Sequence, residues 1–126
     1  MTRPCILILD DEPSFGELLV ECLSDEGYAP TYRPIGQTGY RAIAAVHPCL
    51  VVADLPAEPP ERQWELLTEI WRAPGPARPR VILCSAYVNF LRAHAEELAA
   101  RGVLIVEKPF ELDDILARVA EALGPR

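Results

Sequence analysis

The sequence lacks several features that mark common classes of protein. It contains no run of lysine or arginine, and its formal net charge is −7, which argues against a surface that binds DNA or RNA. No apolar stretch reaches membrane-spanning length, and the N-terminus lacks the charged, apolar and small-residue zones of a signal peptide. The four cysteines show no Cys-x-x-Cys spacing and lie in apolar surroundings, where cysteine packs as a small hydrophobe. These absences predict a cytoplasmic protein that contacts neither membrane nor nucleic acid.

What the sequence does contain is a regular alternation of apolar runs and helical patterns. Its 126 residues are half apolar, enough to bury a core without disulfides, and they predict one domain spanning 1–126. The expected strands are at 5–9, 28–33, 49–53, 81–84 and 103–106. The expected helices lie between Pro13 and Gly27, at 39–47, at 64–71, at 88–101 and between Leu112 and Gly124.

This alternation predicts the fold class. Apolar strands without polar breaks, separated by helices, are typical of an α/β protein whose parallel sheet is covered on both faces. The expected strand at 28–33 contains Pro30 and precedes Pro34, so it should lie at an edge, because proline cannot complete a central ladder. We therefore predict a doubly wound, flavodoxin-like five-stranded parallel sheet with strand order 2-1-3-4-5.

Polar residues follow four of the expected strands. Asp10 and Asp11 follow the first, Asp54 the third, Ser85 the fourth and Lys108 the fifth. The carboxyl ends of parallel strands meet at one edge, where such folds bind ligands. Adjacent carboxylates repel one another unless a cation such as Mg²⁺ joins them. At a single strand end, a solvated loop explains the acids equally well, but four coincident strand ends favour a site equipped for phosphoryl transfer.

With these residues in place, the sequence resembles the receiver domain of bacterial two-component response regulators, the module typified by the chemotaxis regulator. The resemblance covers essentially the whole chain, and its order and spacing are more specific than any one motif. The segments that carry it are 6–13, 39–43, 47–54, 85–86 and 108–110.

The resemblance implies a signalling function with Mg²⁺ as cofactor. Asp54 would accept a phosphoryl group from a sensor histidine kinase, a phosphotransfer protein or a small phosphodonor, and Lys108 and Ser85 would bind that group. The domain would signal to a downstream protein through the face made by its fourth helix, fifth strand and fifth helix. It would not be an enzyme beyond its own phosphoryl transfer and dephosphorylation. The implied metal ligands are Asp10, Asp11, Asp54 and the backbone carbonyl of Pro56.

The sequence also departs from the family at three places. Loop 55–60 carries three prolines and no glycine, unlike the usual loop after the phosphoacceptor. Ile105 stands where the family commonly has an aromatic residue whose rotation reports phosphorylation. In the family, the residues two past the phosphoacceptor and two past the hydroxyl border the approach of water. The resemblance places Pro56 and Tyr87 there, and neither carries an amide or carboxylate to orient water, which predicts slow loss of the phosphate. In the family the Lys108-Pro109 bond is typically cis, and we expect the same here.

Two other functions compete with this one. The departures leave open a receiver-shaped interaction module that does not depend on phosphorylation, although the chain keeps all five polar residues at its strand ends. A small phosphohydrolase with an aspartyl-phosphate intermediate would need its nucleophile and its acid/base two residues apart, whereas Asp10 and Asp11 are adjacent. His47 and His94 have no ligand partners at useful spacing, so we assign them no chemical role.

Overall fold

The computed structural model describes residues 3–34, 43, 45–54, 60–72, 79–86 and 88–124. Its strands are β1 (Cys5–Asp10), β2 (Ala29–Arg33), β3 (Leu50–Asp54), β4 (Arg80–Ser85) and β5 (Val103–Glu107). Its helices are α1 (Pro13–Asp25), α3 (Pro60–Trp71), α4 (Val88–Ala93), α5 (Ala95–Ala100) and α6 (Leu112–Leu123). Within these ranges, no helix combines the length and apolar character that crossing a membrane requires.

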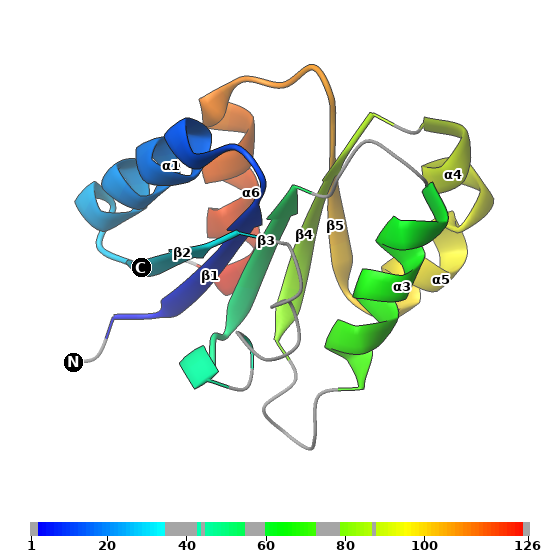
Figure 1. Ribbon diagram of the computed structural model, residues 1–126, viewed down its shortest axis with the longest axis horizontal. Helices are drawn as coiled ribbons and strands as arrows, with labels where there is room; N and C mark the ends of the chain where they lie inside the picture. The colour runs from blue at the N-terminus through cyan, green and yellow to red at the C-terminus, as the bar shows by residue number, and fades with distance from the viewer. Residues whose placement is uncertain are drawn as a thin grey trace.

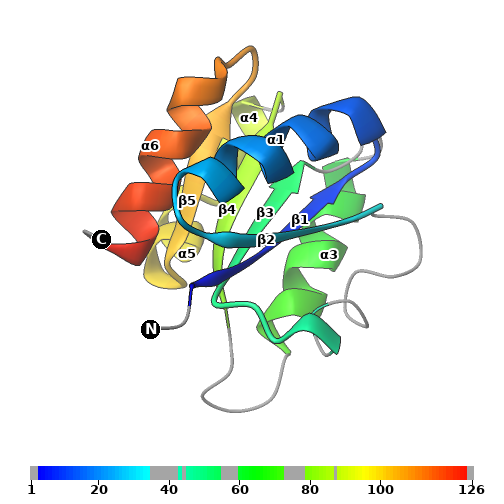
Figure 2. The same ribbon diagram turned by 90° about the vertical axis from the view of Figure 1, so that its left-hand side faces the viewer.

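The five strands form one parallel sheet in the order β2-β1-β3-β4-β5. This confirms the predicted fold class, strand order and edge position of the second strand. Helices α1 and α6 cover one face of the sheet, and α3, α4 and α5 cover the other (Figure 1). Figure 2 shows β2 at the edge of the sheet, beside β1 and below α1. Because all strands run in the same direction, their carboxyl ends share one edge.

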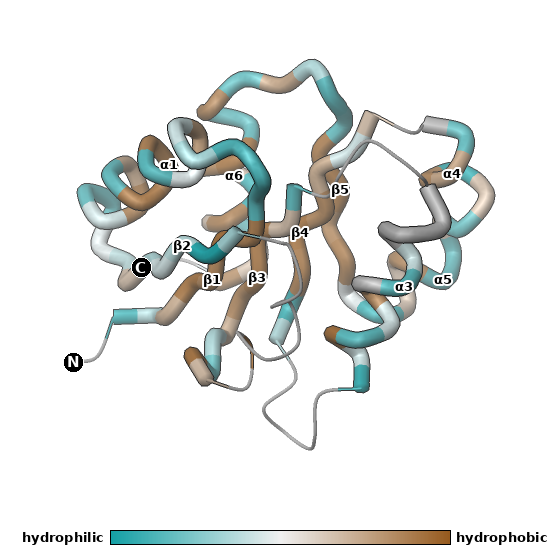
Figure 3. Tube along the Cα trace, viewed as in Figure 1, coloured by the Kyte–Doolittle hydropathy of each residue, from teal (hydrophilic) through white to brown (hydrophobic). Residues whose placement is uncertain are grey.

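The strands are buried on both faces, which explains their unbroken apolar sequence. Alternate residues of each strand point to opposite faces. Leu7, Val51 and Leu83 belong to the core on the side of α3, α4 and α5. Ile8 and Val52 belong to the core on the side of α1 and α6. The apolar strands therefore occupy the middle of the molecule between more polar helices (Figure 3).

The helix predicted at 88–101 was wrong in one respect, because the structure divides it at His94 into α4 and α5. Backbone hydrogen bonds continue through the junction, from His94 N to Phe90 O at 3.2 Å and from Leu98 N to His94 O at 2.9 Å. The His94 backbone nevertheless adopts φ −112° and ψ 14°. Its ring stacks on Trp64 of α3 with centroids 4.2 Å apart, so packing against another helix accounts for the local departure from helical geometry.

This stack is part of an aromatic cluster that joins α3 to the α4–α5 junction. The ring centroids of Trp64 and Trp71 lie 5.4 Å apart, and those of Trp64 and Phe90 lie 6.1 Å apart. Phe90 also contacts His94, with a centroid separation of 4.8 Å. The Arg101 guanidinium lies 4.2 Å from the Trp71 ring centroid, a cation–π contact that covers the outer end of the cluster.

Two other predictions fall partly or wholly outside the described residues. Of the helix expected at 39–47, the structure describes helical conformation at residues 43, 45 and 46. Residues 55–59 of the expected loop lie outside the described ranges. Pro60, which we assigned to that loop, is instead the first residue of α3. Proline suits this position because the first helical residue needs no intrahelical N–H donor.

Candidate functional site

Asp10 ends β1, and its two carboxylate oxygens have different surroundings. The residue is buried, with 3% of its surface exposed. Its Oδ1 accepts a hydrogen bond of 2.8 Å from the Glu12 backbone N–H. Its Oδ2 is buried and makes no hydrogen bond within the part of the chain that the structure describes. Asp11, the next residue, is exposed.

The electrostatic surroundings of Asp10 make its ionisation costly. Burial raises the pKa of Asp10 to about 6, and repulsion from Asp54 and Asp11 acts in the same direction. The Glu12 N–H and the Lys108 ammonium only partly offset these effects. A buried carboxylate oxygen with no partner among the described residues, close to a second carboxylate, matches the oxygen ligands that a hard cation takes. These residues therefore fit a Mg²⁺ ion.

Asp54 lies opposite Asp10 in the sheet and forms an ion pair with Lys108. The register of β1 and β3 pairs Asp10 with Asp54. The Lys108 Nζ contacts Asp54 Oδ1, with 15% of the Asp54 side chain and 35% of the Lys108 side chain exposed. Burial raises the pKa of Asp54, the hydrogen bond and charge of Lys108 lower it, and Asp11 raises it. The site thus places a partly desolvated carboxylate directly beside an ammonium.

Lys108 reaches this edge because its backbone extends the β4–β5 ladder. Lys108 lies one residue beyond the end of β5, and its N–H donates a 2.9 Å hydrogen bond to the carbonyl of Ser85. The Lys108-Pro109 peptide bond is cis, as predicted. Beyond it, the ring of Phe110 contacts that of Phe15 on α1, with centroids 5.7 Å apart. The segment after β5 is therefore anchored both to β4 and to α1.

Ser85 ends β4 at the same edge, with 1% of its surface exposed. Its register partner is Glu107, the residue before Lys108. The neighbouring Cys84 is fully buried, and burial raises the pKa of its thiol far above the ordinary value. A thiol in this state is a packing group and a poor nucleophile, so we assign Cys84 no chemical role.

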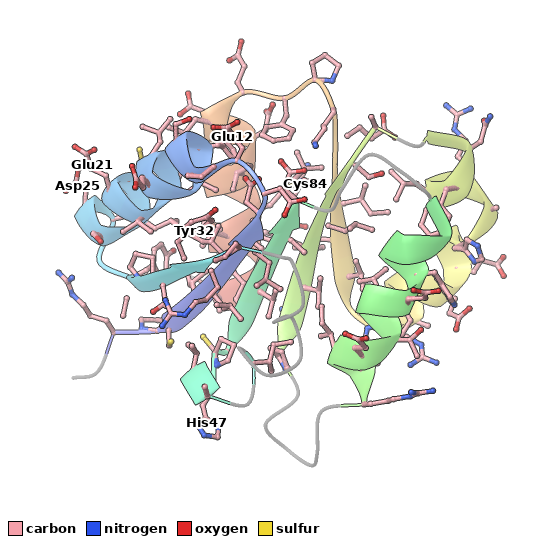
Figure 4. The ribbon with its side chains drawn as sticks, viewed as in Figure 1. Glu12, Glu21, Asp25, Tyr32, His47 and Cys84 are labelled. Atoms are coloured by element: carbon pink, nitrogen blue, oxygen red, sulfur yellow. The ribbon has the colours of Figure 1, made fainter. Side chains whose placement is uncertain are left out.

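The structure thus brings five of the predicted site residues to one edge of the sheet. They are Asp10, Asp11, Asp54, Ser85 and Lys108. Pro56 and Tyr87 lie outside the described residues, so their predicted roles remain predictions. Figure 4 shows His47 at the opposite edge from Glu12 and Cys84. Among the described residues, no three His, Cys, Asp or Glu side chains are arranged to hold a metal together, but Mg²⁺ is commonly bound by one or two carboxylates and several waters.

Glu12, the third acid of the first turn, is occupied elsewhere. Its carboxylate accepts hydrogen bonds from the backbone N–H and the hydroxyl of Ser14. It therefore caps the N-terminus of α1, where a negative charge also meets the positive end of the helix dipole. Asp10 and Asp11 are the acids of this turn that remain for a ligand.

Tyr32 also contacts the site, although no sequence motif indicates this. The Tyr32 hydroxyl on β2 donates a 2.9 Å hydrogen bond to the backbone carbonyl of Asp10. Tyr32 lies within the edge strand expected at 28–33. Nothing local in the sequence marks it, because the contact depends on the register of β2 against β1.

Fold and site together define a flavodoxin-like α/β domain with a carboxylate-and-lysine site at its strand ends. No protein-family model matches the chain. It is 30% identical over 118 residues to the probable transcriptional regulatory protein SilR of Salmonella typhimurium, covering 94% of this chain and 50% of SilR. It is 35% identical over 125 residues to the DNA-binding transcriptional regulator NtrC of Rhizobium meliloti (strain 1021), covering 98% of this chain and 25% of NtrC.

A solved structure of a signal receiver domain is similar to almost the whole of this chain. The signal receiver domain of a putative Luxo repressor protein from Vibrio parahaemolyticus matches with a TM-score of 0.74 and 25% sequence identity, covering 96% of this chain and 90% of that one. The chain is therefore a receiver domain of the response-regulator family. It spans half the length of SilR and a quarter of NtrC, so the match concerns only part of each of those proteins.

Proposed function

We propose that residues 1–126 form a single phosphoacceptor receiver domain of a two-component system, phosphorylated on Asp54 in a Mg²⁺-dependent reaction. One observation carries this proposal: the Asp54 carboxylate is paired with Lys108 at the edge where a buried oxygen of Asp10 has no partner among the described residues. A nucleophile, a cation for the phosphoryl oxygens and a metal ligand are the parts that phosphoryl transfer to a carboxylate requires.

In the proposed reaction, an Asp54 carboxylate oxygen attacks the phosphorus atom of the donor. With a phosphohistidine of a sensor kinase or phosphotransfer protein, a P–O bond forms, the P–N bond breaks, and the departing imidazole nitrogen takes a proton from solvent. With acetyl phosphate, the bond to the acetyl oxygen breaks and acetate leaves with the electron pair. The product in both cases is an acyl phosphate on Asp54.

Other residues of the chain would bind the metal and the transferred phosphoryl group. Asp10 and Asp11 would hold the metal together with Asp54 and, as the resemblance to the family implies, the backbone carbonyl of Pro56. Mg²⁺, when bound, supplies positive charge against the phosphoryl oxygens. The Lys108 ammonium, which contacts the Asp54 carboxylate, is close enough to pair with the phosphoryl group after transfer. The Ser85 hydroxyl stands at the neighbouring strand end to donate a hydrogen bond to it.

The conformational change that follows phosphorylation would pass from Ser85 to the helix after β4. Ile105 is partly buried and packs against the core on the side of α3, α4 and α5. An aliphatic side chain there cannot report phosphorylation by rotation of a ring. We therefore assign the change to the end of β4 and to α4, and the downstream protein partner to the face made by α4, α5, β5 and α6.

The test is phosphorylation with acetyl phosphate, read by intact-mass spectrometry. We expect one phosphoryl group on the wild type with Mg²⁺, and none on Asp54→Ala or on protein kept in EDTA. Asp113→Ala, which removes an exposed acid from the first turn of α6, is the matched control and should label fully. Equal labelling of Asp54→Ala would refute the proposal, and absence of labelling in the wild type would favour the phosphorylation-independent interaction module.

A further inference from the structure

Tyr32 reaches the proposed metal site from a neighbouring strand. Its register partner on β1 is Ile8, two residues before Asp10. Two residues of a strand span about 6.6 Å, and a tyrosine side chain is long enough to cover this distance. The hydroxyl then donates to the Asp10 carbonyl at 2.9 Å. Figure 4 shows Tyr32 beneath α1, beside the strand that carries Asp10.

Gly16 of α1 provides the space for this side chain. A Cβ atom at position 16 would lie 2.4 Å from two atoms of the Tyr32 ring, closer than real contacts allow. The Tyr32 ring therefore occupies the space that the side chain of any residue other than glycine would need at position 16. Gly16 is buried, and the ring packs against the core on the side of α1 and α6.

Two hydrogen bonds fix the position of Asp10, and one of them comes from Tyr32. The Tyr32 hydroxyl binds the backbone carbonyl of Asp10, and the Glu12 N–H binds its Oδ1. Each bond fixes a different part of the residue, and Oδ2 is the oxygen left without a partner among the described residues. Ligands held in place before binding cost less to order when the ion arrives.

We propose that Tyr32 is a positioning residue for the metal site, and that its hydroxyl orients Asp10 towards Mg²⁺. This inference rests on the proposed function, because it concerns the same site. The ring and the hydroxyl have separate roles: the ring fills the space over Gly16, while the hydroxyl acts only on the backbone of the turn. Removing the hydroxyl alone should therefore affect metal binding more than folding.

The main test is Mg²⁺ binding by isothermal titration calorimetry on unphosphorylated protein. We expect Tyr32→Phe to weaken binding about 3- to 10-fold, the effect of losing one hydrogen bond between neutral groups, with little change in the melting temperature without metal. Tyr28→Phe is the matched control, because Tyr28 is also buried in the core on the side of α1 and α6 but lies just before β2, at the opposite end of that strand from Tyr32. It should bind Mg²⁺ like the wild type.

Two further measurements keep the inference testable if Tyr32→Phe folds poorly. Gly16→Ala should displace the Tyr32 ring while leaving its hydroxyl in the chain, and it should weaken Mg²⁺ binding to a similar degree. The double variant should bind no more weakly than the weaker single variant, because both remove the same hydrogen bond. In metal-free protein, the Glu12 amide proton should exchange faster in Tyr32→Phe, since the turn has lost one of its two anchors.

The outcomes separate this inference from the proposed function. If Tyr32→Phe and Gly16→Ala both bind Mg²⁺ with the dissociation constant of the wild type, the role of Tyr32 is overturned and the proposed function is unaffected. Weakened Mg²⁺ binding by Tyr32→Phe together with a marked fall in its melting temperature, while Gly16→Ala binds Mg²⁺ like the wild type, also overturns it, because Tyr32 is then a packing residue. A wild type that binds no Mg²⁺ overturns both. Weakened binding with preserved stability, together with normal binding by Tyr28→Phe, supports the role.

Discussion

Asp10→Asn should stabilise the metal-free protein at neutral pH. The pKa of Asp10 is raised from 3.8 to about 6, chiefly by burial. At about 1.4 kcal/mol per unit, ionising this carboxyl in the folded state costs about 3 kcal/mol. Asparagine keeps the oxygen that accepts the Glu12 N–H and carries no charge, so the variant should avoid most of that cost. For a domain of this size, 3 kcal/mol corresponds to roughly 10 °C in melting temperature.

The sign of the pH dependence follows from the direction of the shift. Because the folded-state pKa lies above the unfolded one, the folded protein binds more protons between about pH 4 and pH 6. Stability from this group is fully present below pH 4 and is lost as the pH rises through about 6. The difference between Asp10→Asn and wild type should therefore be largest at pH 7 to 8 and vanish near pH 4.

Urea unfolding in EDTA at several pH values measures this difference directly. Asp25→Asn is the control, since Asp25 is exposed at the other end of α1 and should change stability by less than about 0.5 kcal/mol. Adding Mg²⁺ should then stabilise the wild type and leave Asp10→Asn unchanged. If Asp10→Asn is less stable than wild type at pH 7.5, or if its advantage does not depend on pH, the reasoning from burial is wrong.

Two further predictions concern Lys108 and the segment that follows it. Lys108→Ala should lower the free energy of unfolding at pH 7.5 by about 1–2 kcal/mol, because Asp54 loses its charged hydrogen-bond partner, and should slow labelling by acetyl phosphate. Unfolding in urea and the rate of mass increase measure the two effects, and unchanged values would show that the ion pair contributes nothing. Phe110→Ala removes the ring contact with Phe15 and should cost about 1–2 kcal/mol, whereas a loss below 0.5 kcal/mol in the same assay would mean that this contact does not anchor the segment.

The parts of the structure that the sequence predicted depend on local patterns and on one general rule. Unbroken apolar runs located the strands because a parallel sheet is buried on both faces. Pro30 marked the edge strand, which pairs with β1 alone among the strands that the structure describes. The meeting of Asp10, Asp54 and Lys108 followed because parallel strands end at the same edge, whatever the details of their packing.

The parts that the sequence did not predict depend on contacts between distant segments. The division of the helix at His94 arises from a ring stack with Trp64, 30 positions earlier in the chain. The contact of Tyr32 with the Asp10 carbonyl needs the register of β2 and the missing side chain of Gly16 together. No residue close to His94 or Tyr32 in the sequence indicates which distant residue each of them contacts.

The aromatic cluster between α3 and the α4–α5 junction has an optical consequence. The chain has two tryptophans, and both Trp64 and Trp71 belong to this cluster. Their indole rings contact the His94 ring and the Arg101 guanidinium, groups supplied by the junction and by the end of α5. The intrinsic fluorescence of the protein is therefore a built-in reporter of how α4 and α5 sit against α3, on the side of the sheet that the proposed signal would reach.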